Sequence, residues 1–220
     1  MNAASALAHV RALGTPVVTT DDAVHILGAE RSAATHTLKR LATAGLLKRI
    51  RHGLWATDLN LDPLLLPEYL TAPFPSYISF QSALFFHGLV SQIPNVIYVA
   101  SLAQTRTVRT SLGTFSIHRV APRVFGGYET VQTSGVRLAT PEKALFDTLY
   151  LAPARSRLFA HLPEVDLPKH FDGDRIRYWI RRIPAGPRRK AVELRFEAVL
   201  KAQRRRRGRP ARHPGAKART

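Results

Sequence analysis

The sequence has no cysteine, one methionine and only 15 acidic residues against 33 lysines and arginines. Without cysteine the chain has no disulfide, no thiolate metal ligand and no cysteine nucleophile, which suits a reducing cytosol. No apolar run approaches the roughly 18 residues that a membrane span needs. Residues 1–13 lack the basic start and long apolar stretch of a secretory signal. These absences predict a cytoplasmic protein with no membrane partner.

Catalytic signatures are missing too. The sequence has no glycine loop ending in Gly-Lys-Ser/Thr, no His-Glu-x-x-His and no Gly-x-Ser-x-Gly. The histidines are scattered, and no pair combines ligand spacing with a shared expected element. Asp172 and Asp174 could hold a metal, but a turn and helix cap is the favoured interpretation. Gly126-Gly127 lacks the context of a dinucleotide site and predicts a turn. We therefore expect no enzyme activity, no catalytic residue, no metal and no cofactor.

The surplus of positive charge is the strongest signal in the composition. The formal net charge is +18, which predicts a polyanionic partner. Residues 201–220 carry nine basic residues and no acidic one, so half of the net charge lies there. Residues 204–220 are rich in Arg, Gly and Pro, which predicts a disordered basic tail. The tail residues expected to contact nucleic acid are Arg204, Arg205, Arg206, Arg207 and Arg209.

Residues 1–58 predict three helices followed by a hairpin. The helices are expected over 4–13, 21–28 and 32–44, and the third carries an apolar stripe of Ala34, Leu38 and Leu41. Residues 46–56 predict two short strands around a turn at His52-Gly53, although their apolar positions do not alternate cleanly. This order of elements is typical of a winged helix-turn-helix.

In such a fold the second helix of the motif lies in the major groove, and a basic wing contacts phosphates or the minor groove. Any one polar residue here is more simply an ordinary solvated side chain, but the ensemble favours DNA binding. The net charge of residues 1–58 is only +3, so tight binding needs a dimer, several copies or the tail. The expected DNA-binding residues are Arg31, Ser32, Thr35, His36, Lys39, Arg40, Thr43, Lys48, Arg49, Arg51 and His52.

The rest of the chain predicts a Pro/Leu-rich junction over 59–75 and a mixed α/β C-terminal domain over 76–203. The junction is expected to be partly helical around 64–70. Strands are expected near 96–101, 105–110, 114–120, 130–133 and 136–138. Helices are expected over 80–88 after a Ser79 cap, from Thr140 onward, and over 174–182 and 188–203. The fold class is therefore α+β. Glu142 and Lys143 are expected to be a helix-start acid and a surface lysine, and His87 a helix-end residue bonded to a backbone carbonyl.

Several segments resemble those of AbiEi-type antitoxins, and the resemblance covers roughly residues 5–200. Residues 46–55 (LLKRIRHGLW) are similar to the family's wing, and 79–89 (SFQSALFFHGL), 97–101 (IYVAS) and 140–147 (TPEKALFD) to its C-terminal segments. The resemblance implies a winged helix that binds inverted repeats in its own promoter and represses the operon. It also implies a C-terminal domain that counters a cognate nucleotidyltransferase-like toxin. The Arg-rich tail is outside the family pattern.

Two alternatives stay open. The tail could make the chain a general nucleic-acid or RNA-binding protein, although its lack of aromatic residues argues against base stacking. The C-terminal domain could instead be a protein-interaction module in which DNA binding is incidental. The sequence leaves the oligomeric state on DNA open.

Overall fold

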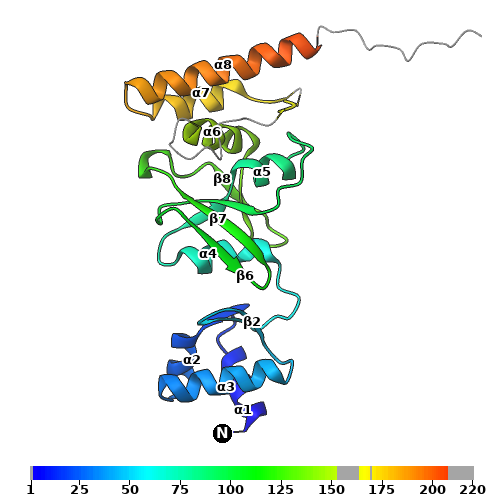
Figure 1. Cartoon of the computed structure of the whole chain (residues 1–220), viewed down its shortest axis with the longest axis vertical. Helices are drawn as coiled ribbons and strands as arrows, with labels where there is room; N and C mark the ends of the chain where they lie inside the picture. The colour runs from blue at the N-terminus through cyan, green and yellow to red at the C-terminus, as the bar shows by residue number, and fades with distance from the viewer. Residues whose placement is uncertain (1, 153–163, 169, 208–220) are drawn as a thin grey trace, which may run out of the picture.

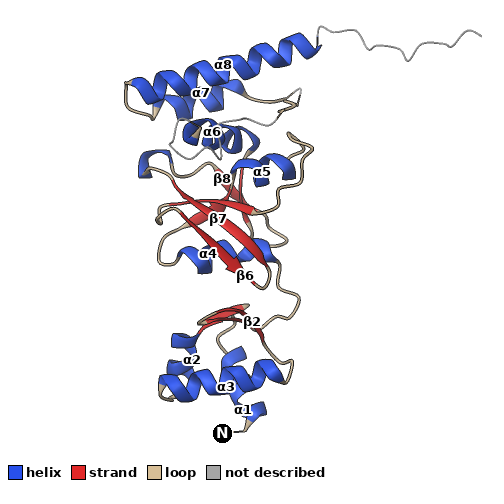
Figure 2. Cartoon of the chain, viewed as in Figure 1, coloured by secondary structure: helices blue, strands red, loops and turns tan. Residues whose placement is uncertain are grey.

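The computed structural model describes residues 2–152, 164–168 and 170–207. It is a mixed α+β structure with two sheets, in agreement with the predicted fold class (Figure 2). The molecule is elongated, with a three-helix unit at one end and a pair of packed helices at the other (Figure 1).

The N-terminal unit contains three helices and three short strands. Asn2 accepts a hydrogen bond from the Ser5 backbone and starts the first helix. Thr19 and Asp22 form a reciprocal capping box at the second helix, and Gly28 ends that helix in the left-handed region. The elements are α1 (Ala3–Arg11), β1 (Val17–Thr19), α2 (Thr20–Leu27), α3 (Arg31–Thr43), β2 (Lys48–Arg51) and β3 (Leu54–Ala56).

The three strands form an antiparallel sheet in the order β1-β3-β2, so the predicted hairpin is present and gains a strand that was not predicted. Trp55 faces the helices and packs in a core with Ala34, Leu38 and Leu41 of α3. The predicted apolar stripe of α3 is therefore buried, which leaves the opposite side of the helix exposed.

The other face of this small sheet packs on the C-terminal domain. Ile50 and Leu54 share a core with Phe115 and Ile117 of a strand in the large sheet. The Ser111 backbone N–H donates to the Ile50 carbonyl at 2.9 Å, and the Ser111 hydroxyl donates to the Arg49 carbonyl at 2.9 Å. The hairpin is therefore held against the body of the protein.

The C-terminal domain is built on a six-stranded mixed sheet in the order β6-β7-β5-β4-β9-β8. Alternate residues of β5 face opposite cores: Val99 faces the N-terminal unit, and Ala100 faces the helices on the other side. The strand β4 was not predicted. The elements are η1 (Pro63–Leu65), α4 (Leu66–Thr71), β4 (Ser76–Ile78), α5 (Phe80–Phe86), β5 (Ile97–Ser101), β6 (Arg106–Thr110), β7 (Gly113–Arg119), η2 (Pro122–Val124), β8 (Tyr128–Thr130), β9 (Arg137–Ala139), α6 (Pro141–Leu151), α7 (Gly173–Arg181) and α8 (Pro187–Arg207).

Two expectations about helix ends are wrong. Helix α8 continues to Arg207, so residues 204–207 are helical rather than part of a disordered tail. The helix continues because Gln203 donates to the Leu167 carbonyl at 3.2 Å and Arg206 forms ion pairs with Glu164 and Asp166. Arg209 and the remainder of the predicted tail lie outside the described residues. Ser79 precedes α5 but makes no capping hydrogen bond, because its hydroxyl donates to a buried carboxylate instead.

Candidate nucleic-acid interface

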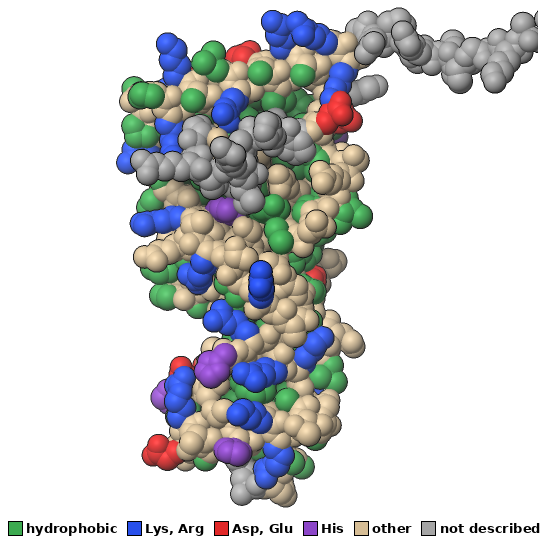
Figure 3. Space-filling view, viewed as in Figure 1, with side chains coloured by type: hydrophobic (Ala, Val, Ile, Leu, Met, Phe, Trp, Pro, Cys, Tyr) green, Lys and Arg blue, Asp and Glu red, His purple; other side chains and the backbone are tan. Residues whose placement is uncertain are grey.

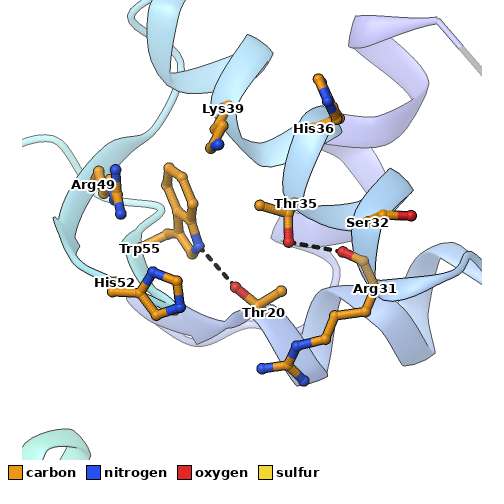
Figure 4. A pocket seen from close by; sticks show the side chains of 10 residues that line it. Thr20, Arg31, Ser32, Thr35, His36, Lys39, Arg49, His52 and Trp55 are labelled. Atoms are coloured by element: carbon orange, nitrogen blue, oxygen red, sulfur yellow. Dashed lines mark hydrogen bonds between the residues drawn. The ribbon is translucent and has the colours of Figure 1, made fainter.

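A groove of about 530 Å³ lies between α3 and the β2–β3 hairpin. Its wall on one side is the exposed face of α3, and on the other side it is the hairpin (Figure 4). Seven of the eleven residues predicted to bind DNA line this groove. They are Arg31, Ser32, Thr35, His36, Lys39, Arg49 and His52.

The remaining four predicted residues lie outside the groove. Arg40 and Thr43 are exposed on α3, Lys48 is half-buried at the start of β2, and Arg51 is exposed at its end. These four side chains flank the groove without lining it. The structure therefore divides the predicted DNA-binding residues into seven that line the groove and four that lie beside it.

The floor of the groove is Trp55, which we did not predict as a site residue. Its indole Nε1 donates to the Thr20 hydroxyl at 3.3 Å. The Arg49 guanidinium lies 5.6 Å from the centre of the indole ring, because Arg49 and Trp55 are register partners in the hairpin. The sequence offered a signal, since Trp55 comes two residues after Gly53 of the hairpin turn, but its apolar character marked it only as core.

The cations of the groove differ in how they are compensated. Arg31 forms an ion pair with Asp21, and both side chains are 65% exposed. Lys39 and Arg49 have no carboxylate partner among the described residues. The Thr35 hydroxyl donates to the Arg31 carbonyl at 2.7 Å. Lys39 and Arg49 are therefore the cations best placed to meet an anion that enters the groove.

A second group of polar residues lies inside the C-terminal domain, and here the expectation of a surface lysine is wrong. The Lys143 and Asp147 side chains are 0% exposed and form an ion pair one turn apart on α6. The Lys143 ammonium also donates to the Val124 carbonyl at 2.8 Å. The Asp147 carboxylate accepts from the Tyr77 hydroxyl at 3.0 Å and the Ser79 hydroxyl at 2.7 Å.

Burial dominates the electrostatics of this cluster. It lowers the pKa of Lys143 and raises the pKa of Asp147, and the attraction between the two charges opposes both shifts. The ammonium lies 4.6 Å from the Trp179 ring centre and 4.9 Å from that of Phe146. No charged atom of the pair reaches solvent, so both charges are held by protein groups alone. The signal in the sequence was the Lys–Asp spacing of four within an otherwise apolar helix.

Two other expectations about this domain are confirmed. His87 Nε2 lies 2.7 Å from the Ala139 carbonyl oxygen, so a backbone carbonyl satisfies the ring. Asp172 caps α7 by accepting from the Asp174 backbone at 2.9 Å. Glu142 is also buried, and its carboxylate accepts from the Asp172 backbone at 3.3 Å.

Within the described ranges, no three His, Cys, Asp or Glu side chains come close enough together to hold a metal ion. Among the described helices, none combines the length and the apolar character needed to cross a bilayer. No protein-family model and no curated protein matches the chain.

Proposed function

We propose that this chain binds double-stranded DNA sequence-specifically through a winged helix-turn-helix formed by residues 1–58. In this proposal α2 and α3 are the helix-turn-helix and the β2–β3 hairpin is the wing. The observation that carries the proposal is the groove itself. Side chains from two separate elements, helix α3 and the hairpin, converge on it, and its uncompensated cations Lys39 and Arg49 come one from each element.

The geometry of duplex DNA fits this arrangement. A helix of 13 residues is about 20 Å long and enters a major groove about 12 Å wide. With Ala34, Leu38 and Leu41 turned into the core, the polar face of α3 can approach base edges. Ser32, His36 and Lys39 are the groove residues suited to base or phosphate contact. Arg49 and Arg51 on the wing suit the phosphate backbone.

The resemblance to AbiEi-type antitoxins supports a more specific proposal. The DNA would be the inverted repeats of the chain's own promoter, and the protein would repress its own operon. The C-terminal domain would counter a cognate nucleotidyltransferase-like toxin. Two segments that carry the resemblance, 79–89 and 140–147, meet where Ser79 bonds to Asp147. Because this contact is buried, those segments support the domain's core, and a toxin-facing surface would lie elsewhere in 76–203.

The test is binding of the purified full chain to its upstream DNA and to scrambled DNA across a salt series. The variant Lys39→Ala with Arg40→Ala removes one groove cation and one flanking cation of α3. A lost base or phosphate contact is worth about 1–3 kcal/mol, so we expect affinity for the upstream DNA to fall about tenfold or more.

The matched control is Arg109→Ala with Arg119→Ala, which removes two exposed cations from the large sheet. It should bind the upstream DNA like the wild type. Unchanged binding by the α3 variant would contradict the assignment of α3. Equal and steeply salt-dependent binding to both DNAs would favour general nucleic-acid binding instead.

A further inference from the structure

The end of the molecule opposite the N-terminal unit is a second strongly basic region. It consists of α7 and α8, which pack on each other and on α6 (Figure 1). Residues 173–207 carry thirteen lysines and arginines against three acidic residues, a net charge of +10. This charge exceeds the +3 of residues 1–58, and +6 of it (nine basic minus three acidic residues) lies in residues 173–203, before the predicted tail.

The three acidic residues neutralise little of this charge. Asp174 and Glu197 pair with Arg177, and Glu193 pairs with Arg189. Acidic residues outside the segment also pair with it: Asp172 with Arg175, and Glu164 and Asp166 with Arg206. Several exposed cations of α8 have no carboxylate partner in the part of the chain that the structure describes. They are Lys190, Lys201, Arg204 and Arg205.

Lys201, Arg204 and Arg205 lie together on one side of α8, and Lys190 lies on the same side about three turns earlier, with Leu194 and Glu197 between them. At 100° per residue, positions 190, 201, 204 and 205 lie on the side opposite Val192 and Phe196, which are buried against the domain. We call the four the outer face of α8. Because the inner side of α8 faces the body, the outer face points away from it (Figure 3 shows lysines and arginines along this end).

We propose that the outer face of α8 binds the phosphate backbone of a second DNA duplex, so that one molecule bridges two duplex segments. The proposal rests on the proposed function, which places the first duplex at α3. Helix α8 lies at the end of the elongated molecule opposite the N-terminal unit (Figure 1), and its outer face is the side turned away from the residues that α8 buries against the domain. A duplex seated in the α3 groove would therefore have to curl around the end of the protein to reach it.

The chemistry of the outer face favours a nucleic-acid duplex over a single strand or a lipid surface. The aromatic residue of α8, Phe196, is 1% exposed, so the helix offers no ring for stacking the bases of a single strand. Leu194 is the large apolar side chain exposed on α8, which is too little for insertion into a lipid interface. From Lys190 to Arg205 the helix rises about 23 Å, less than one turn of duplex DNA. Contacts of this kind read phosphates and no sequence.

The experiment uses the full chain with the upstream duplex fixed to beads and a labelled scrambled duplex in solution. The test variant is Lys201→Gln with Arg204→Gln and Arg205→Gln. We expect the wild type to capture the labelled duplex and the test variant to capture at least about fivefold less, because three phosphate contacts are lost. The slope of log capture against log salt should become shallower by about 2.7. Binding to the fixed upstream duplex should be unchanged.

Two further variants separate charge from structure. Lys201→Arg with Arg204→Lys and Arg205→Lys keeps the charge and should keep the capture. Arg11→Gln with Arg109→Gln and Arg119→Gln removes three exposed charges outside α7 and α8 and should also keep it.

Several results would overturn the proposal. Undiminished capture by the test variant would place bridging elsewhere, for example in a dimer of winged helices. If the protein binds long duplexes more tightly but does not capture the labelled duplex, the α3 groove and the outer face of α8 contact one and the same duplex. Capture of a labelled RNA duplex in place of DNA would name a different partner. Failure of the proposed function gives a different result: beads that carry the upstream duplex would then retain no more protein than beads that carry scrambled DNA.

Discussion

Replacing Lys143 with Met should destabilise the fold far more than the loss of an ordinary lysine. The substitution leaves the Asp147 carboxylate 0% exposed and without its counter-ion. Breaking a buried ion pair from one side typically costs about 3–5 kcal/mol. Asp147 keeps the Tyr77 and Ser79 hydroxyls as donors, at 3.0 and 2.7 Å. We therefore expect a loss near the lower end, about 3 kcal/mol of the free energy of unfolding.

The double variant Lys143→Met with Asp147→Asn tests whether the loss comes from an orphaned charge. It removes both charges, while the amide oxygen still accepts from Tyr77 and Ser79. We expect it to be less destabilised than the sum of the two single variants by about 2–3 kcal/mol.

Urea unfolding followed by circular dichroism and tryptophan fluorescence measures these free energies. Trp179 reports on the site directly, because its ring centre is 4.6 Å from the Lys143 ammonium. Lys201→Met is the matched control: its side chain is exposed, so its effect should stay within about 0.5 kcal/mol. A loss below about 1 kcal/mol for Lys143→Met, or strictly additive single variants, would refute the reasoning.

Two further predictions concern a buried histidine and a tightly packed glycine. Burial lowers the pKa of His118 from 6.5 to about 4. The folded protein therefore keeps the imidazole neutral at pH values where the unfolded chain protonates it, so the free energy of unfolding is unaffected above pH 6.5 and decreases as the pH falls toward 4. Between pH 7 and pH 5 the wild type should lose about 2 kcal/mol more than His118→Gln in urea unfolding, and parallel losses would contradict this. Gly127→Ala would place its Cβ 2.6 Å from a Trp179 ring carbon at a φ of +72°, whereas at Gly135, with a φ of +75°, the nearest atom is 3.8 Å away. Both substitutions should lower the free energy of unfolding by about 1–2 kcal/mol through backbone strain, and Gly127→Ala should lower it by about 1–3 kcal/mol more because of the clash with Trp179. Thermal or urea unfolding measures both losses, and equal losses would disprove the close approach.

The hairpin shows why some local patterns were hard to interpret from the sequence. Its apolar positions do not alternate, because Leu54, Trp55 and Ala56 are all buried. Trp55 packs on the helices, while Leu54 and Ala56 pack on the large sheet. A strand covered on both faces loses the period-two pattern. The sequence predicted the hairpin, but the surface that covers its back comes from residues about 60 positions away.

The sequence by itself determined most of the helices and the polar side of α3. These features depend on contacts within a few residues, such as the Thr19 and Thr140 caps and the stripe of Ala34, Leu38 and Leu41. Strands β1 and β4 were missed because each has three residues and is defined by its pairing partners, which are distant in the chain.

Only the tertiary structure decided which charged residues are buried and which surfaces face outward. The sequence predicted Lys143 to be a surface residue, but the elements packed around α6 bury it. It predicted Trp55 to be a core residue, but the structure places Trp55 at the floor of the groove. The outer face of α8 likewise depends on which side of the helix the domain covers. In each case the physical reason is the same: burial depends on every element packed around a residue, and a local stretch of sequence records only one of them.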